Sequence, residues 1–186
     1  MDSVKLHETP LNGLYEIHTA AIGDERGTFS RLFCEKDFTS IRRALNFTQI
    51  NLSETRKKGT VRGMHYQIPP VAEAKLIRCL QGSVFDVAID LRANSSTFLN
   101  WHAVELSYDN NRAIFIPEGF AHGFQALTDN VQLLYMHTAP WTPSFEAGLL
   151  YNDPRLAIAW PHPAILVSDK DRAYPLLNNS YVGVHA

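Results

Sequence analysis

The sequence predicts an all-β fold, an antiparallel barrel or sandwich, for the 186 residues of this chain. Short apolar runs recur along it and are separated by Gly, Pro, Asn and Asp, which is typical of such folds. Prolines concentrate from Pro140 onwards, and that density is poorly compatible with a central β-sheet. We therefore expect a single domain over residues 1–186, with a barrel core at about 45–140 and an irregular C-terminal cover.

The expected strands follow from the apolar runs in chain order, and they are Leu14–Ile22, Thr28–Cys34, Phe47–Ser53, Lys75–Leu80, Ser83–Leu91, Trp101–Leu106, Arg112–Ile116, Gly123–Ala126 and Gln132–His137. Asp24–Gly27 is expected to be a turn, because it combines Asp and Gly between two runs. Short peripheral helices are expected at Lys36–Leu45 and near Pro154–Ile158.

The run Ser83–Leu91 alternates between large apolar residues and small or acidic ones. Its apolar face holds Phe85, Val87, Ile89 and Leu91, and its other face holds Asp86, Ala88 and Asp90. A barrel that holds a polar ligand needs one packed face and one polar or small face. An ordinary half-exposed strand gives the same pattern, so alternation alone leaves both interpretations open.

The composition excludes several classes of function. Charged residues make up 19% of the chain and the formal net charge is −2, so we expect no nucleic-acid partner and no membrane surface. Cys34 and Cys79 form no CxxC pair, which disfavours zinc and thioredoxin-like sites. The N-terminus has no signal-peptide pattern and no run reaches transmembrane length, so the expected compartment is the cytoplasm.

The segment Arg62–Gln67 holds the first candidate for chemistry. In an extended strand His65 and Gln67 point to the same side, and imidazole is well suited to exchange protons near neutral pH. A lone strand histidine is more often structural. Here Arg62, Gln67 and Lys75 lie close in sequence and supply donors for an anionic or keto-bearing ligand.

His122 begins a strand after a turn that contains Pro117 and Gly119. The run PEGFAHGF resembles the second motif of cupin barrels, many of which bind a metal through two His and a Glu in the first motif and one His in the second. The first motif here reads His65-Tyr66-Gln67 and lacks the HxH pair. One His from each motif is too few for a transition-metal site, so we predict no metal.

Two further segments carry groups that could move a proton. Tyr135 could donate one, although a phenol ordinarily has a pKa of about 10, and a core tyrosine with a bonded hydroxyl is the alternative. The run Ser168–Asp171 reads as a solvated loop by default. A carboxylate from this run could instead hold a histidine in the tautomer that a general base needs.

The chain resembles the dTDP-4-dehydrorhamnose 3,5-epimerase family through a series of motifs in the family's order and roughly its spacing. The resemblance covers about Leu14 to Pro175, nearly the whole chain. One short motif would be weak evidence, but a collinear series is specific. The motifs are DERGTF, QINLSETRKKGTVRGMHYQIPP, AKLIRCLQGSVFDVAIDLR, IFIPEGFAHGF, LLYMHT, NDPRLAIAWP and VSDKD.

The resemblance implies a cupin-type jelly roll that is usually a homodimer, with N-terminal strands that cross to the partner. It implies an isomerase without a cofactor that inverts C3 and C5 of a nucleotide-linked 4-keto-6-deoxy-hexose. The expected reaction converts dTDP-4-dehydro-6-deoxy-D-glucose to dTDP-4-dehydro-L-rhamnose, commonly a step towards rhamnose for cell-surface polysaccharide. The 4-keto group makes this possible because it acidifies the hydrogens at C3 and C5.

The same resemblance implies the catalytic roles. His65 is the base, Asp171 orients it, Tyr135 is the acid and Lys75 stabilises the charge that develops on the keto oxygen. One such fixed donor in a dry pocket is worth on the order of 3 kcal/mol. Asp86, on the polar face of its strand, is expected to support Lys75 or His65.

The resemblance also implies substrate contacts. Arg62, Gln49 and Asn51 match positions that contact the sugar and diphosphate, and His122 matches a pocket histidine beside the sugar. Arg26 and Phe29 match positions near the nucleotide that reach the partner's site.

Two positions depart from the family's usual pattern. Arg31 stands where the family usually has Glu, on the nucleotide side, which leaves the nucleotide preference open. Trp141 stands where the family commonly has Tyr, and Trp keeps the stacking surface but lacks the hydroxyl.

Three alternatives remain open from the sequence. An epimerase for C3 or C5 alone, or for another nucleotide sugar, would use the same base and acid. A 3,4-ketoisomerase also begins with proton abstraction. A cupin that only binds a sugar needs no matched acid and base, so the combined His65, Lys75, Tyr135 and Asp171 argue against it.

Overall fold

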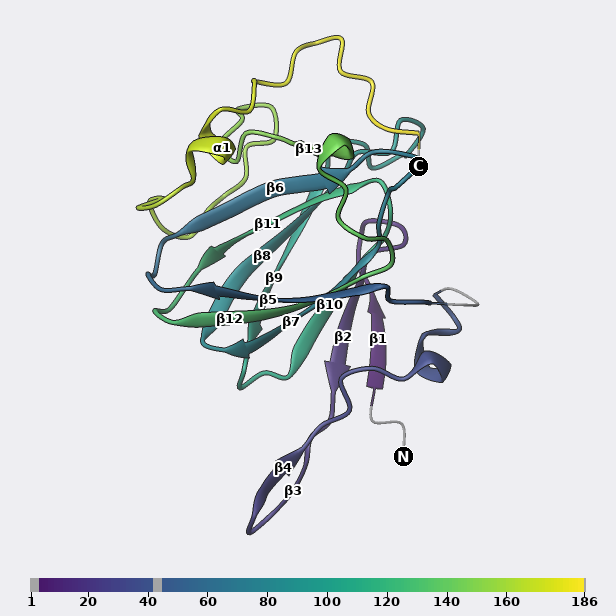
Figure 1. The fold of residues 1–186 in the computed structure, drawn as a ribbon, viewed down its shortest axis with the longest axis vertical. Coiled ribbons are helices and arrows are strands. Elements are labelled where there is room, and N and C mark those ends of the chain that lie inside the picture. The colour runs from purple at the N-terminus through teal and green to yellow at the C-terminus, as the bar shows by residue number, and fades with distance from the viewer. Residues whose placement is uncertain (1–3, 42–44, 186) are drawn as a thin grey trace.

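Two antiparallel sheets face each other in the computed structural model, which describes residues 4–41 and 45–185 (Figure 1). The six-stranded sheet has the order β1 (Val4–Glu8), β2 (Tyr15–Thr19), β10 (Arg112–Ile116), β7 (Lys75–Gln81), β12 (Val131–His137) and β5 (Gln49–Thr55). The five-stranded sheet has the order β13 (Glu146–Gly148), β6 (Val61–Gln67), β11 (Phe120–Ala126), β8 (Ser83–Asp90) and β9 (Trp101–Ser107). The all-β antiparallel prediction is confirmed.

The strand β8 shows how the two predicted faces are used. Val84 and Ala88 belong to the core between the sheets, and Asp86 on the same face is fully buried. Phe85 and Val87 belong to a second cluster, which packs under the C-terminal segment. The polar and small face therefore looks into the barrel, while the apolar face supports the cover.

The N-terminal part departs from prediction beyond Thr19. The expected strand Leu14–Ile22 is divided into β2 and β3 (Ile22–Asp24), and Thr28–Cys34 shrinks to β4 (Gly27–Phe29). β3 and β4 form a hairpin that projects from the body as an arm (Figure 1), and all of its strand residues are exposed. The apolar residues of this arm do not pack against a core in their own chain. Strand propensity alone therefore does not determine how long these two strands are.

The predicted helices are largely wrong. Lys36–Leu45 gives only a 3-10 turn at Glu35–Phe38, and residues 42–44 lie outside the described ranges. Pro154–Ile158 is not helical, because the buried Asp153 carboxylate accepts hydrogen bonds from the Arg155 N–H (2.8 Å) and the Leu177 N–H (2.6 Å). A side chain that binds nearby backbone in this way competes with the helical pattern. A second 3-10 turn lies at Pro143–Phe145.

The C-terminal segment contains one helical turn, α1 (Asp169–Arg172), which lies above β6 (Figure 1). The sequence suggested a solvated loop here, yet Asp171 is buried. Ser168 caps the turn, because its Oγ accepts a hydrogen bond from the Asp171 N–H at 3.1 Å. This cap fixes the direction in which the Asp171 side chain enters the barrel.

Gly63 lets β6 and β11 approach each other closely, two residues before His65. Its φ is +117°, and a Cβ there would lie 2.6 Å from the Cα of Gly123 and 2.7 Å from the carbonyl oxygen of His122. The register between β6 and β11 shifts at this point, and His65 pairs with His122. A bulge of this kind re-aims side chains, and here it places the two imidazoles side by side.

Gly63→Ala should therefore destabilise the fold by about 3 kcal/mol, through backbone strain and overlap with backbone atoms. Gly27→Ala is the matched control, since Gly27 also has a positive φ (+131°) but no heavy atom within 4 Å of its Cβ position. We expect about 1 kcal/mol there. Urea denaturation of both variants measures the difference, and equal losses would contradict the close approach.

Candidate active site

A cavity of about 550 Å³ opens between the two sheets and under the C-terminal segment. It brings together most of the side chains that the sequence singled out. The predicted residues among those that line it are Asn51, Arg62, His65, Lys75, His122, Tyr135, Trp141 and Asp171. These residues come from positions as far apart in the chain as Asn51 and Asp171, and a cavity with several converging polar groups is the default candidate for a ligand site.

His65 is held by Asp171 through a contact that joins the barrel to the cover. The distance from His65 Nε2 to Asp171 Oδ1 is 2.7 Å, and Asp171 Oδ2 accepts a bond from the Gly63 N–H at 3.1 Å. Burial raises the pKa of Asp171, but the hydrogen bonds from His65, Gly63 and Ser168 outweigh it and lower that pKa. The charged carboxylate keeps a proton on Nε2, so Nδ1 carries the lone pair of a neutral His65.

Tyr135 faces the cavity from the other sheet. It lies on β12 of the six-stranded sheet, whereas His65 lies on β6 of the five-stranded sheet. Its ring packs edge-on against His122, with 5.8 Å between the ring centroids, and stacks on His137 at 5.9 Å. Burial, and then the charge of Asp86, raise the pKa of Tyr135 well above its ordinary value. The phenol therefore holds its proton near neutral pH.

Lys75 brings a positive charge into the cavity from β7. Its side chain is 8% exposed, and its Nζ lies 3.2 Å from Oε1 of Glu73. The backbone carbonyl of His65 is a second acceptor, at 3.4 Å. The ammonium group is therefore held between the two sheets, next to the strand that carries the imidazole.

Asp86 has a different partner from the one that the sequence suggested. Its two oxygens lie 3.0 and 2.9 Å from Nε2 of His122, and neither side chain is more than 5% exposed. Burial lowers the pKa of His122, against the opposing effect of Asp86. Asp86 thus orients His122, rather than Lys75 or His65.

Two of the predicted binding residues, Arg62 and Trp141, line the cavity and are themselves exposed. Arg62 is fixed by bonds to Thr55 Oγ1 (3.0 Å) and to the carbonyl of Glu54 (2.9 Å). Trp141 is 56% exposed, and its backbone N–H donates to Gln49 Oε1 at 2.9 Å. Gln49 therefore holds the Trp141 loop and is not among the residues that line the cavity.

Arg26 and Phe29 lie on the projecting arm and do not line this cavity. Arg26 forms an exposed ion pair with Asp24, and Phe29 is 74% exposed. Arg31, beyond the arm, lies 3.7 Å from Asp37 Oδ2. In this chain taken alone, the arm residues are therefore separate from the site.

The ionisable residues of the cavity that were missed from the sequence include Glu73 and His137, as well as the Glu146–Lys170 ion pair at 2.7 Å. Glu73 contacts both Lys75 (3.2 Å) and His137 Nδ1 (2.8 Å). Each lies two positions from a predicted residue, since Glu73 precedes Lys75 and His137 follows Tyr135. The period-two rule for strands would have placed them on the same faces as those residues.

Among residues 4–41 and 45–185, no group of three or more His, Cys, Asp or Glu side chains is arranged to hold a metal ion. The same part of the chain contains no helix that is both long and apolar enough to cross a membrane.

The two facing sheets, with an imidazole on one wall and a phenol on the other, define a cupin-type barrel with an acid–base site. The family model described as dTDP-4-dehydrorhamnose 3,5-epimerase matches residues 8–179. The chain belongs to this family.

Known proteins of the same family cover most of the chain. The dTDP-4-dehydrorhamnose 3,5-epimerase of Shigella flexneri is 45% identical over 150 residues, which are 80% of this chain and 82% of that protein. The crystal structure of the Bacillus anthracis enzyme of the same name, with TDP and PPi bound, has a TM-score of 0.90 and 38% identity and covers 94% of this chain and 99% of its own. The dTDP-6-deoxy-D-glucose-3,5-epimerase of Legionella pneumophila, solved with dTDP-4-keto-L-rhamnose, has a TM-score of 0.88 and 39% identity and covers 93% and 92%.

The raised pKa of Tyr135 gives a direct test of its environment. In the folded protein Tyr135 should stay protonated at about pH 10, where an ordinary tyrosine is half ionised. The tyrosinate absorbance of the wild type and of Tyr135→Phe should therefore coincide up to that pH. In denaturant the two curves should differ by one tyrosine, and such a difference in the folded proteins would contradict the burial of the phenol.

Proposed function

We propose that this chain is a cofactor-independent isomerase that inverts C3 and C5 of a nucleotide-linked 4-keto-6-deoxy-hexose. Its reaction converts dTDP-4-dehydro-6-deoxy-D-glucose to dTDP-4-dehydro-L-rhamnose. The observation that carries the proposal is the placement of His65 and Tyr135 on opposite walls of one cavity. Relatives at this level of similarity are named as 3,5-epimerases, so the single-carbon epimerase, the ketoisomerase and the simple binding protein are not favoured.

His65 takes the proton in the first step. Its Nδ1 lone pair removes a hydrogen from the carbon beside the 4-keto group, and the electrons of the C–H bond move onto the keto oxygen to give an enolate. The imidazolium that forms is stabilised by Asp171, 2.7 Å from Nε2. Asp171 keeps its negative charge throughout, which fits its lowered pKa.

Lys75 stabilises the enolate. Its ammonium group is nearly buried and fixed before the substrate arrives. A preorganised donor of this kind contributes on the order of 3 kcal/mol, because it acts on charge that develops only during the reaction.

Tyr135 completes the inversion from the opposite wall. Its phenolic proton is delivered to the same carbon on the other face, and the enolate electrons return to form the carbonyl. The cycle leaves a phenolate and an imidazolium, and these are reset when Tyr135 regains a proton and His65 loses one to solvent. The same base and acid then serve the second carbon.

We propose that the enzyme is a homodimer whose arms complete the nucleotide end of each other's site. The support is the arm itself, which projects from the body (Figure 1) and exposes Ile22 (67%) and Phe29 (74%). The edge strand β5 adds exposed apolar side chains at Ile50 (62%) and Leu52 (55%). Exposed apolar side chains on an arm and on an edge strand are expected of a surface that a partner covers.

We also place the enzyme in the cytoplasm. Cys34 and Cys79 are free thiols, which fits a reducing compartment.

His65→Ala should lower the rates of both proton exchange and turnover by at least about a thousandfold, because no other side chain replaces the base. Tyr135→Phe should keep exchange closer to the wild-type rate than product formation, since abstraction precedes the step it serves. Proton NMR in deuterium oxide with dTDP-4-dehydro-6-deoxy-D-glucose measures both. Full turnover by His65→Ala would refute the mechanism, and exchange at one carbon alone would support a single-carbon epimerase.

Mixed dimers test the role of the arm. Arg26→Ala/Phe29→Ala should lower the affinity for dTDP, while His65→Ala should bind dTDP normally. When the two variants are unfolded and refolded together, each mixed dimer contains one site with an intact arm and an intact base. Turnover should then rise well above that of either variant, and no rise, with a monomer in sedimentation, would count against a shared site.

A further inference from the structure

Glu73 is a buried carboxylate in the cavity that the acid–base scheme does not use. Its side chain is 7% exposed and touches two cationic or potentially cationic groups, with Oε1 3.2 Å from Lys75 Nζ and Oε2 2.8 Å from His137 Nδ1. Burial raises the pKa of Glu73, but the hydrogen bond from His137 and the charge of Lys75 outweigh it and lower that pKa. The group is therefore a charged bridge between two strands, β7 and β12.

The bridge limits where the Lys75 ammonium can go. An ammonium group has three N–H donors. One is directed at Glu73 and a second at the carbonyl of His65, 3.4 Å away on the opposite sheet. This leaves one donor for a ligand. A lysine carries a flexible four-carbon stem, so two fixed acceptors remove motion that the substrate would otherwise have to remove.

His137 holds the other end of the bridge. Because its Nδ1–H donates to Glu73, a neutral His137 carries its lone pair on Nε2, and the amide Nδ2 of Asn51 lies 3.4 Å from that atom. In the sheet, His137 pairs with Lys75 on one side and with Gln49 on the other. Its ring also stacks on Tyr135 at 5.9 Å. His137 thus connects the carboxylate to a predicted sugar contact and supports the phenol ring.

We propose that Glu73 and His137 are positioning residues for the epimerisation: together they fix the Lys75 ammonium and the Tyr135 ring in the geometry that the enolate requires. This inference rests on the proposed function. Loss of a purely structural pair would affect folding, whereas loss of a positioning pair lowers the rate of the chemical step. A small displacement of a catalytic group costs up to about a hundredfold in rate.

Substitutions at Glu73 test the bridge. Glu73→Ala should lower kcat by about ten- to a hundredfold, with KM within about threefold, because the ammonium loses its fixed acceptor while the binding residues remain. Glu73→Gln keeps an oxygen that can accept from Lys75 and should retain more of kcat than Glu73→Ala. If the Ala variant does not fold, the Gln variant still carries the test, with a kcat between about a half and a tenth of wild type expected.

Substitutions at His137 test the other end. His137→Asn keeps an N–H donor near the position of Nδ1 and should retain more of kcat than His137→Ala. If the two residues act as one unit, Glu73→Ala/His137→Ala should cost no more than the larger single effect. Losses that multiply would show two independent residues and would contradict the proposed pair.

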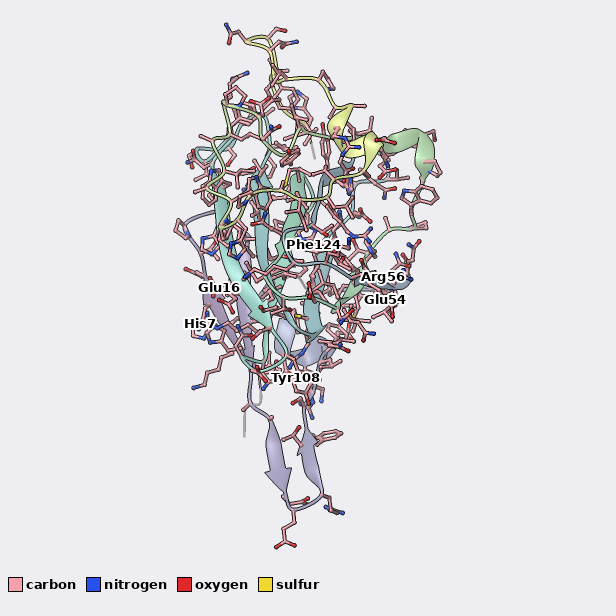
Figure 2. All side chains as sticks on the ribbon, turned by 90° about the vertical axis from the view of Figure 1, so that its left-hand side faces the viewer. His7, Glu16, Glu54, Arg56, Tyr108 and Phe124 are labelled. Carbon is pink, nitrogen blue, oxygen red and sulfur yellow. The ribbon has the colours of Figure 1, made fainter. Side chains whose placement is uncertain are left out.

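The chain offers a matched control in the Glu16–His102 pair. His102 Nε2 lies 2.9 Å from Glu16 Oε1, and this pair joins β2 to β9 outside the lining of the cavity. Figure 2 labels Glu16 beside His7, on the side of the molecule that carries β1 and β2. Glu16→Ala and His102→Ala should leave kcat and KM unchanged, although they remove the same kind of carboxylate–imidazole contact.

The outcomes separate the two levels of inference. Wild-type protein without epimerase activity would refute the proposed function, and the role of the pair with it. Active wild type together with Glu73→Ala that retains kcat within about twofold, measured well below its unfolding temperature, would overturn the positioning role alone. A loss of kcat in the cavity variants but not in the Glu16 and His102 controls is the result that we expect.

Discussion

The hydrogen bond between His65 and Asp171 is the interaction on which the rest of the site depends. It joins β6 of the barrel to the helical turn of the C-terminal cover at 2.7 Å. The contact therefore links the cover to the barrel and fixes the imidazole tautomer that can act as a base. Because Asp171 also accepts the Gly63 N–H, the carboxylate binds the backbone next to the bulge that aims His65. One side chain of the cover thus contacts both the base and the backbone that aims it.

The two-sheet architecture suits the stereochemistry of the proposed reaction. Inversion at a carbon requires a base and an acid on opposite faces of a ring, and a cavity between two sheets offers two opposed walls. His65 and Tyr135 come from different sheets, so neither has to reach around the substrate. The buried charges that line the walls are paired, with Asp86 against His122 and Glu73 against Lys75. Pairing matters, because an isolated buried charge costs several kcal/mol.

The fold and half of the site followed from local sequence pattern, and the rest did not. Alternation predicted β10 at its observed bounds and the two faces of β8, because strand pattern depends only on neighbours two positions apart. The helix expected near Pro154 failed, because a carboxylate that binds backbone at Leu177 decides that conformation. The His65–Asp171 contact spans 106 residues, and only the resemblance to a family placed the two together. Glu73 and His137 were within reach of the period-two rule, yet no motif drew attention to them.

The projecting arm carries predicted contacts that one chain alone does not bring to the cavity. Arg26 and Phe29 belong to an exposed hairpin that projects from its own barrel. Exposure of an apolar phenylalanine side chain to water is unfavourable. A nucleotide-linked sugar extends beyond the acid–base centre. Trp141, which is exposed and lines the cavity, offers one aromatic face to the nucleotide end of such a ligand. A second aromatic face, from a partner's Phe29, would enclose the nucleobase on both sides. The same contact would cover the apolar arm. The same contact would then stabilise the dimer and bind the nucleotide, so association and substrate affinity would be coupled.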